Sequence, residues 1–122
     1  MGTAPPAVRG WRALLWALVL TICWLAFDPK PPPAADTGHD KLSHAIAFLV
    51  LAVCAVRAHP AQPLHRLFGA LLAFGALIEV VQSRIPGRSA EWADLLADAI
   101  GIALGALLAL WWLRREAPRS PP

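Results

Sequence analysis

The chain has 122 residues, of which 57% are hydrophobic and only 16% are charged, and its formal net charge is +3. This composition is too apolar for an ordinary soluble domain and indicates that the chain folds in lipid. The lysines and arginines stand at the ends of apolar segments rather than together on one exposed element. A phosphate-binding surface requires such grouping, so we expect no nucleic-acid partner.

The first apolar run covers residues 13–27 and follows a short segment, residues 1–12, that carries Arg9 and Arg12. A basic start and an apolar core of this length also fit a signal peptide, with residues 33–35 resembling a cleavage site. Tryptophans in and beside the run favour a helix that stays in the mature protein, because tryptophan is enriched at membrane interfaces. We therefore expect a first membrane span at 13–27.

Prolines and charged residues divide the rest of the chain into three further apolar spans. The segment 28–38 is rich in proline, which cannot continue a helix, and is expected to be an extended linker. The remaining boundaries are 40–56 for the second span, 57–66 for a basic turn, 67–85 for the third span, 91–113 for the fourth, and 114–122 for a basic tail. The predicted fold class is all-α, a polytopic membrane protein whose residues 13–113 form four transmembrane helices in an up-down bundle.

Lysine and arginine are unequally divided between the two ends of this predicted bundle. Seven lie at the end that holds both termini and four at the other, namely Arg9, Arg12, Arg57, Arg66, Arg114, Arg115 and Arg119 against Lys30, Lys41, Arg84 and Arg88. Basic residues are enriched in cytoplasmic loops. We therefore expect the segment 1–12, the turn 57–66 and the tail 114–122 in the cytoplasm, and the linker 28–38 facing outward.

Polar side chains interrupt three of the spans near the outward end. Residues three or four apart share a helix face, and with a rise of about 1.5 Å per residue these side chains lie at similar depths. A charged side chain at the centre of a membrane helix costs about 2.5 to 3.5 kcal/mol on insertion scales, so it needs a partner, a cavity or water. We expect one cluster in the outer leaflet, formed by His44, Glu79, Asp94 and Asp98. The candidate site residues are Asp40, Lys41, His44, Glu79, Gln82, Arg88, Asp94 and Asp98, with Gln82 and Arg88 at the rim.

Two glycines continue the polar face of the fourth span. Gly101 and Gly105 form a small-xxx-small pair, which predicts close approach of another helix. Cys23 and Cys54 lie near opposite surfaces, and the sequence has no zinc-type cysteine spacing. The sequence alone therefore assigns neither a metal site nor a cofactor.

Taken together, these motifs resemble the VanZ-like family of small bacterial membrane proteins. The resemblance covers about residues 40–110 and rests on Asp40-Lys41-x-x-His44-x-x-x-Phe48, Glu79-x-x-Gln82, Pro86-Gly87-Arg88-Ser89, Asp94, Gly101 and Gly105. The chain departs from the family pattern at Ile78, where an acidic residue often precedes the glutamate, and at Asp98, where asparagine is more usual. The resemblance implies a four- or five-helix domain in the bacterial cytoplasmic membrane, and the family's founding member is associated with low-level teicoplanin resistance.

Three functions remain open at this point. The first is a non-enzymatic envelope protein whose outward pocket binds a polar, lipid-linked or glycopeptide-like ligand, with Lys41 and Arg88 contacting anionic groups. The second is an intramembrane enzyme in which His44 acts as a base or a metal ligand beside the carboxylates. The third is a structural membrane subunit whose polar network fixes helix packing. Because the sequence contains no nucleophile motif, we expect a binding protein rather than an enzyme.

Overall fold

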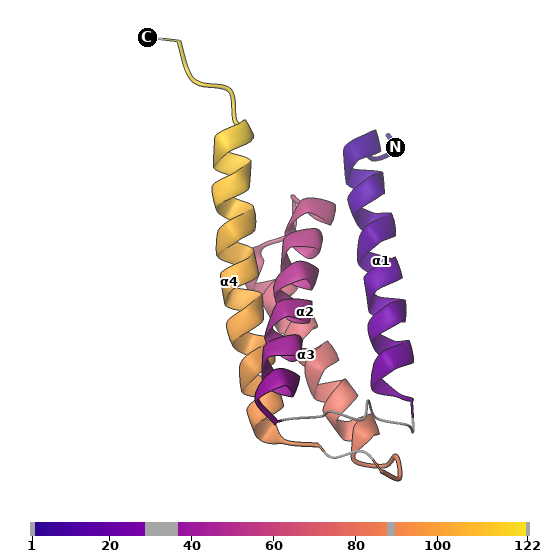
Figure 1. Ribbon diagram of the computed structural model, residues 1–122. Coiled ribbons are helices and arrows are strands. Elements are labelled where there is room, and N and C mark those ends of the chain that lie inside the picture. The colour runs from indigo at the N-terminus through magenta and orange to yellow at the C-terminus, as the bar shows by residue number, and fades with distance from the viewer. Residues whose placement is uncertain (1, 29–36, 88–89, 122) are drawn as a thin grey trace.

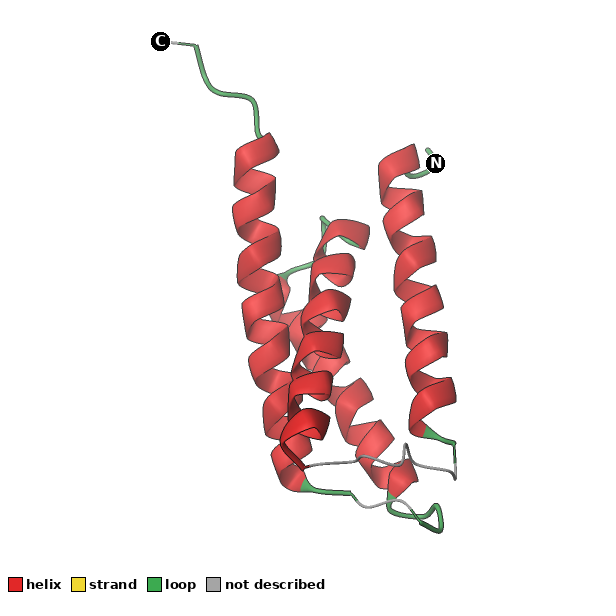
Figure 2. Ribbon diagram, viewed as in Figure 1, coloured by secondary structure: helices red, strands yellow, loops and turns green. Residues whose placement is uncertain are grey.

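The structure, a computed structural model, describes residues 2–28, 37–87 and 90–121, with only the backbone described at 37–40. Within these ranges the chain forms helices α1 (Pro6–Ala26), α2 (Thr37–Ala58), α3 (Leu64–Gln82) and α4 (Trp92–Glu116), and no strand (Figure 2). Each of them contains a stretch that is long and apolar enough to cross a membrane. The all-α fold class predicted from the sequence is confirmed.

The helices run in alternating directions. Figure 1 shows both ends of the chain on the same side as the turn between α2 and α3. The end of α1, the start of α2, the end of α3 and the start of α4 lie on the opposite side. We term the first side the termini end and the second the cluster end. This arrangement is the predicted up-down bundle.

Several helix boundaries differ from those expected. α2 begins at Thr37 rather than residue 40, so the end of the expected linker 28–38 is helical, and α3 begins at Leu64 rather than residue 67. α1 begins at Pro6 instead of residue 13, because proline is compatible with the first helical turn, where the backbone N–H has no intrahelical partner. α4 continues to Glu116, beyond residue 113. α3 ends at Gln82 rather than residue 85, and the chain then turns toward Gly87, whose φ of 83° suits glycine.

α2 is the central helix, since it contacts α1, α3 and α4 and packs most extensively on α4. All of its residues from 51 to 56 are buried, which explains why this half of α2 has no polar face. Gly101 and Gly105 of α4 lie directly against α2. A Cβ at Gly101 would collide with the carbonyl oxygen of Ala45, and one at Gly105 with that of Leu49.

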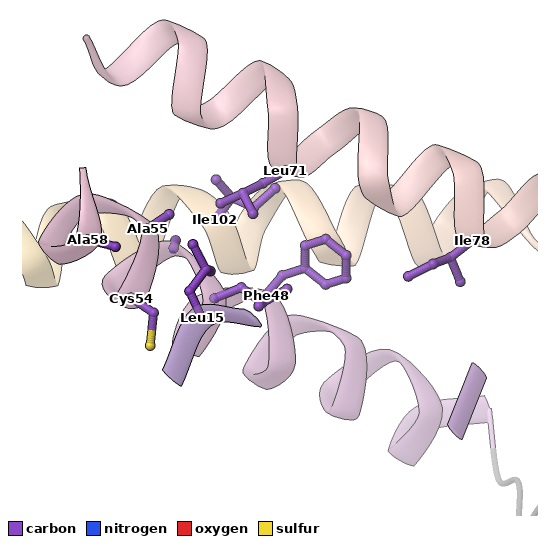
Figure 3. Close-up of a cluster of buried hydrophobic side chains, with 10 residues drawn as sticks. Leu15, Phe48, Cys54, Ala55, Ala58, Leu71, Ile78 and Ile102 are labelled. Atoms are coloured by element: carbon purple, nitrogen blue, oxygen red, sulfur yellow. The ribbon is translucent and has the colours of Figure 1, made fainter. Parts of the chain in front are cut away.

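The interior of the bundle is filled by apolar side chains from every described helix. Figure 3 shows Phe48 pointing from α2 toward α3, with Leu71, Ile78 and Ile102 nearby. The ring of Phe48 also lies 6.0 Å from that of Phe74, measured between centroids.

Large apolar side chains also cover the outside of the bundle. On α4 they are spaced as a stripe along one face, formed by Leu96, Ile100, Leu104 and Leu107. Such a stripe would promote aggregation in water, whereas lipid solvates it.

Arg57 links three helices at the termini end. Its guanidinium donates hydrogen bonds of 2.7 and 3.2 Å to the carboxylate of Glu116. It also lies over the rings of Trp11 and Trp112, at 5.3 and 4.7 Å from their centroids. The two rings meet edge to face at 5.7 Å. α1, α2 and α4 are therefore tied together at the end opposite the polar residues.

Candidate functional site

Four polar side chains come together at the cluster end, from α2, α3 and α4. They are His44, Glu79, Asp94 and Asp98, and we term them the polar cluster. Glu79, Asp94 and Asp98 are exposed by only 6%, 3% and 1%. Charged or polar groups buried this deeply require hydrogen bonds or opposite charges, so the contacts that each one makes define the chemistry of the site.

His44 and Asp98 form the innermost contact of the polar cluster. The Nδ1 atom of His44 lies 3.0 Å from Oδ1 of Asp98. The second carboxylate oxygen, Oδ2, lies against Gly75 of α3, where an added Cβ would be only 2.6 Å away. Since an ionised carboxylate only accepts hydrogen bonds, the imidazole donates from Nδ1, which places the lone pair of a neutral ring on Nε2.

Glu79 connects α3 to the start of α4. Its Oε2 accepts a hydrogen bond of 3.2 Å from the backbone N–H of Glu91. Glu91 is the residue that precedes the first turn of α4, and N–H groups at a helix start have no partner within the helix. The other oxygen, Oε1, is buried and receives no hydrogen bond from the residues that the structure describes.

Asp94 and Lys41 lie on the water-facing side of the polar cluster. The ammonium of Lys41 is 2.9 Å from Oε2 of Glu91 and 3.8 Å from Oδ1 of Asp94. Asp94 belongs to the first turn of α4, where the helix dipole stabilises negative charge. The side chain of Lys41 is 35% exposed, so it marks the border between the buried carboxylates and solvent.

The remaining predicted site residues stand apart from these contacts or fall outside the described part of the chain. Gln82 was expected at the rim, but its amide Nε2 donates a hydrogen bond of 3.1 Å to the carbonyl of Ala26 and so joins α3 to α1. Arg88 lies outside the described residues, and of Asp40 only the backbone is described.

Two residues of the site were not predicted for it. Gly75 makes room for Asp98, and its position four residues before Glu79, on the same helix face, was an available signal. Glu91 contributes a backbone N–H to Glu79 and a carboxylate to Lys41. Its place just before an apolar helix gave no indication of either contact.

A cavity of about 240 Å³ adjoins the polar cluster between α3 and α4. Glu79 forms part of its wall, and the other residues that line it are Ala76, Val80, Ser83, Ala90, Glu91 and Trp92. Val80 and Trp92 are 56% and 82% exposed on the outside of the bundle. The wall of the cavity therefore combines two acidic residues, Glu79 and Glu91, with apolar side chains.

Three members of the polar cluster can also hold a metal ion. His44, Glu79 and Asp94 each offer one ligand atom, and these atoms all lie within 4.8 Å of one another. Asp98 is not among them, because it contacts the imidazole of His44 instead.

Apolar helices of membrane-spanning length that pack around buried carboxylates and a histidine define a multi-pass membrane protein with a buried polar cluster. The VanZ/LLP1 family model matches residues 11–113, and the chain belongs to this family. The predicted family resemblance is thus confirmed, and the match extends beyond residues 40–110 to include most of α1. No curated protein and no solved structure matches the chain.

Proposed function

We propose that this VanZ/LLP1 family protein binds the polar head of an amphiphilic molecule of the bacterial envelope at its cluster end. The observation that carries the proposal is the position of Glu79, which belongs both to the buried polar cluster and to the wall of the cavity. A ligand in that cavity can meet both acidic residues and apolar side chains. Lipid-linked and glycopeptide-like molecules are the class in which polar and apolar parts are joined in this way.

The chemistry of the wall favours a ligand that donates hydrogen bonds. The carboxylates of Glu79 and Glu91 accept hydrogen bonds, and the hydroxyl of Ser83, which donates to the carbonyl of Val80, can also accept one. Hydroxyl, amide and ammonium groups of a sugar or peptide head group supply the donors. The apolar side chains of Ala76, Val80 and Trp92 suit the adjoining hydrocarbon or ring surface.

The proposal includes an orientation in the cytoplasmic membrane. The excess of arginine at the termini end, together with the positive-inside rule, supports cytoplasmic termini and a cluster end in the outer leaflet. We include α1 in the mature protein, because Leu15 belongs to the core and Gln82 bonds to the carbonyl of Ala26. An outward site can meet envelope precursors and glycopeptides, so teicoplanin resistance is the cellular phenotype to assay.

Filling the cavity tests this proposal directly. Ala76 lines the cavity, so Ala76→Phe should exclude the ligand while leaving every carboxylate in place. Ala73→Phe is the matched control, because Ala73 is exposed on the same helix. Native mass spectrometry of protein purified from bacterial membranes should show a bound amphiphile on the wild type and on Ala73→Phe, but not on Ala76→Phe. Equal retention by both variants would refute the cavity as the binding site.

A further inference from the structure

The ligand atoms of His44, Glu79 and Asp94 are nearly close enough to share one metal ion. Protein nitrogen and oxygen ligands lie about 2.0 to 2.2 Å from zinc, so the ligand atoms of a tetrahedral site are about 3.3 to 3.6 Å apart. The three atoms here lie within 4.8 Å of one another. Binding one ion therefore requires these atoms to approach one another by up to about 1.5 Å, a movement that we assign to rotation of the three side chains.

A second observation points to a cation at this position. Glu79 is only 6% exposed, and its Oε1 atom is buried and receives no hydrogen bond from the described residues. A buried carboxylate oxygen without a donor is unfavourable, because it has lost water and gained no partner. Coordination to a metal ion supplies that partner.

The contact between His44 and Asp98 prepares the imidazole to act as a ligand. Histidines that bind metals almost always donate their other ring N–H to a carboxylate, a carbonyl or a water molecule, which fixes the tautomer and the ring orientation. Asp98, 1% exposed, is the carboxylate in that position, at 3.0 Å from Nδ1. We assign Nε2 as the ligand atom, because Nδ1 contacts Asp98. The His44 side chain is 17% exposed, which leaves a route for an ion from the cluster end.

Among the described groups that contact one another at the polar cluster, carboxylates outnumber cationic groups. The described contacts join four carboxylates, those of Glu79, Glu91, Asp94 and Asp98, to the single ammonium of Lys41 and the imidazole of His44. If these four carboxylates are ionised and the imidazole is neutral, the named groups together carry a net charge of −3. A divalent ion reduces this excess of negative charge to one, which matters in a site surrounded by hydrocarbon.

From these contacts we propose that His44, Glu79 and Asp94 bind one divalent transition-metal ion of the zinc type, with Asp98 as the residue that positions His44. One imidazole and two carboxylates suit zinc, which in catalytic sites keeps three protein ligands and one open position. Magnesium and calcium prefer sets made only of oxygen ligands and should bind more weakly. The inference does not rest on the amphiphile proposal, because the ligand set is complete without the cavity and its test uses the metal alone.

Zinc titration of the purified protein tests the site. The chain is produced with an affinity tag that contains no histidine, stripped with a chelator in detergent, and titrated with Zn²⁺, Mg²⁺ and Ca²⁺ by calorimetry. We expect one Zn²⁺ per chain, binding at least tenfold weaker in His44→Gln and Glu79→Gln, and unchanged binding in His65→Gln, a control at the exposed start of α3. Asp98→Ala should weaken zinc binding by about 10- to 100-fold, as expected for a residue that orients a ligand. Absence of saturable zinc binding by folded wild type, or unchanged binding in His44→Gln, would overturn the proposal.

X-ray absorption of the zinc-loaded wild type tests the same site without any substitution. We expect one imidazole together with oxygen ligands at about 2.0 to 2.2 Å. A spectrum with no imidazole, or with two or more, would assign the ion to other groups and would refute the site. This measurement decides the question even where His44→Gln or Glu79→Gln fails to fold.

Discussion

Gly75 has no side chain, and the polar cluster depends on that absence. It faces Oδ2 of Asp98, and the ring of Phe48 lies just beyond, at 3.3 Å from the position a Cβ would take. The space at Gly75 therefore allows the Asp98 carboxylate to enter the interface between α3 and α4 while its other oxygen contacts His44. A small residue on one helix thus decides where a charge on another helix can lie.

Gly75→Ala should destabilise the protein by disturbing Asp98. The new Cβ would lie 2.6 Å from Oδ2, so the carboxylate must move, and overpacking of this kind costs about 1 to 3 kcal/mol. Gly69→Ala on the same helix meets nothing within 4 Å and should be neutral or slightly stabilising, since alanine favours helices. Unfolding in mixed detergent micelles measures both. Equal stability of the two variants would contradict the role given to Gly75.

Asp98 can be replaced by a side chain of the same shape with little structural cost. In Asp98→Asn the amide oxygen can still accept the hydrogen bond from Nδ1 of His44, now 3.0 Å from the carboxylate. We expect its free energy of unfolding to stay within about 1 kcal/mol of the wild type, whereas Asp98→Leu should lose about 1 to 3 kcal/mol by removing a buried acceptor. Denaturation of both variants under identical conditions separates the two cases. Equal stability of Asp98→Leu and Asp98→Asn would show that the contact with His44 does not contribute to the free energy of unfolding.

At the scale of the helices, the contact between α2 and α4 sets the register of the site. Gly101 and Gly105 bring the α4 backbone against the carbonyl oxygens of Ala45 and Leu49. His44 immediately precedes Ala45, and Asp98 lies three residues before Gly101, so the close backbone approach continues directly into the hydrogen bond between the two side chains.

Gly101→Ala should therefore cost more than Gly75→Ala. The atom that the new Cβ meets is a backbone carbonyl of α2, which cannot rotate away, so the helices themselves must separate. We expect destabilisation at or above the upper end of about 1 to 3 kcal/mol, accompanied by loss of the contact between His44 and Asp98. Unfolding measurements beside Gly75→Ala give the ranking. A milder effect than that of Gly75→Ala would show that α2 and α4 have room to adjust.

Arg57 should stabilise the packing of α1 and α4 on α2 at the termini end. Arg57→Ala removes an ion pair with Glu116 and two cation–π contacts. Each cation–π contact contributes about 0.5 to 1 kcal/mol or more. We expect a lower melting temperature for Arg57→Ala and almost none of this effect for Arg66→Ala, whose side chain is exposed. Thermal unfolding followed by circular dichroism measures the difference. Equal melting temperatures of the two variants would contradict this role.

The sequence predicted the helices well because their signals are local. Apolar runs, prolines and glycines determine where each span begins and ends to within a turn or two, and the depth of each polar residue follows from its distance along the helix. The partner of each polar residue was harder to predict. The contact between His44 and Asp98 depends on how α2 is rotated against α4. The hydrogen bond from Gln82 to Ala26 depends on how the end of α3 packs against α1. The sequence predicts Arg57 only as part of a basic turn, because the two tryptophans that its guanidinium contacts are distant in sequence.

At the scale of the whole molecule, the two ends of the bundle differ in chemistry. The termini end carries most of the arginines and is tied by Arg57, while the cluster end carries the buried carboxylates. Because basic residues are enriched on the cytoplasmic side of membrane proteins, this asymmetry predicts which end of the bundle faces the cytoplasm. The orientation of the bundle in the membrane determines from which compartment a proposed ion or ligand would reach His44 and Glu79.

Cysteine labelling should place the cluster end outside the cell. In a background where Cys23 and Cys54 are replaced by alanine, Ala90→Cys reports the cluster end and Ala61→Cys the turn between α2 and α3, and both positions are exposed. The spans predicted from the sequence assign seven of the lysines and arginines to the side of the termini and four to the other. The positive-inside rule therefore predicts that a membrane-impermeant maleimide labels Ala90→Cys on intact spheroplasts. Ala61→Cys should react only after lysis. The reverse pattern would turn the polar cluster toward the cytoplasm, and the proposed envelope ligand would then have no access to Glu79 from outside.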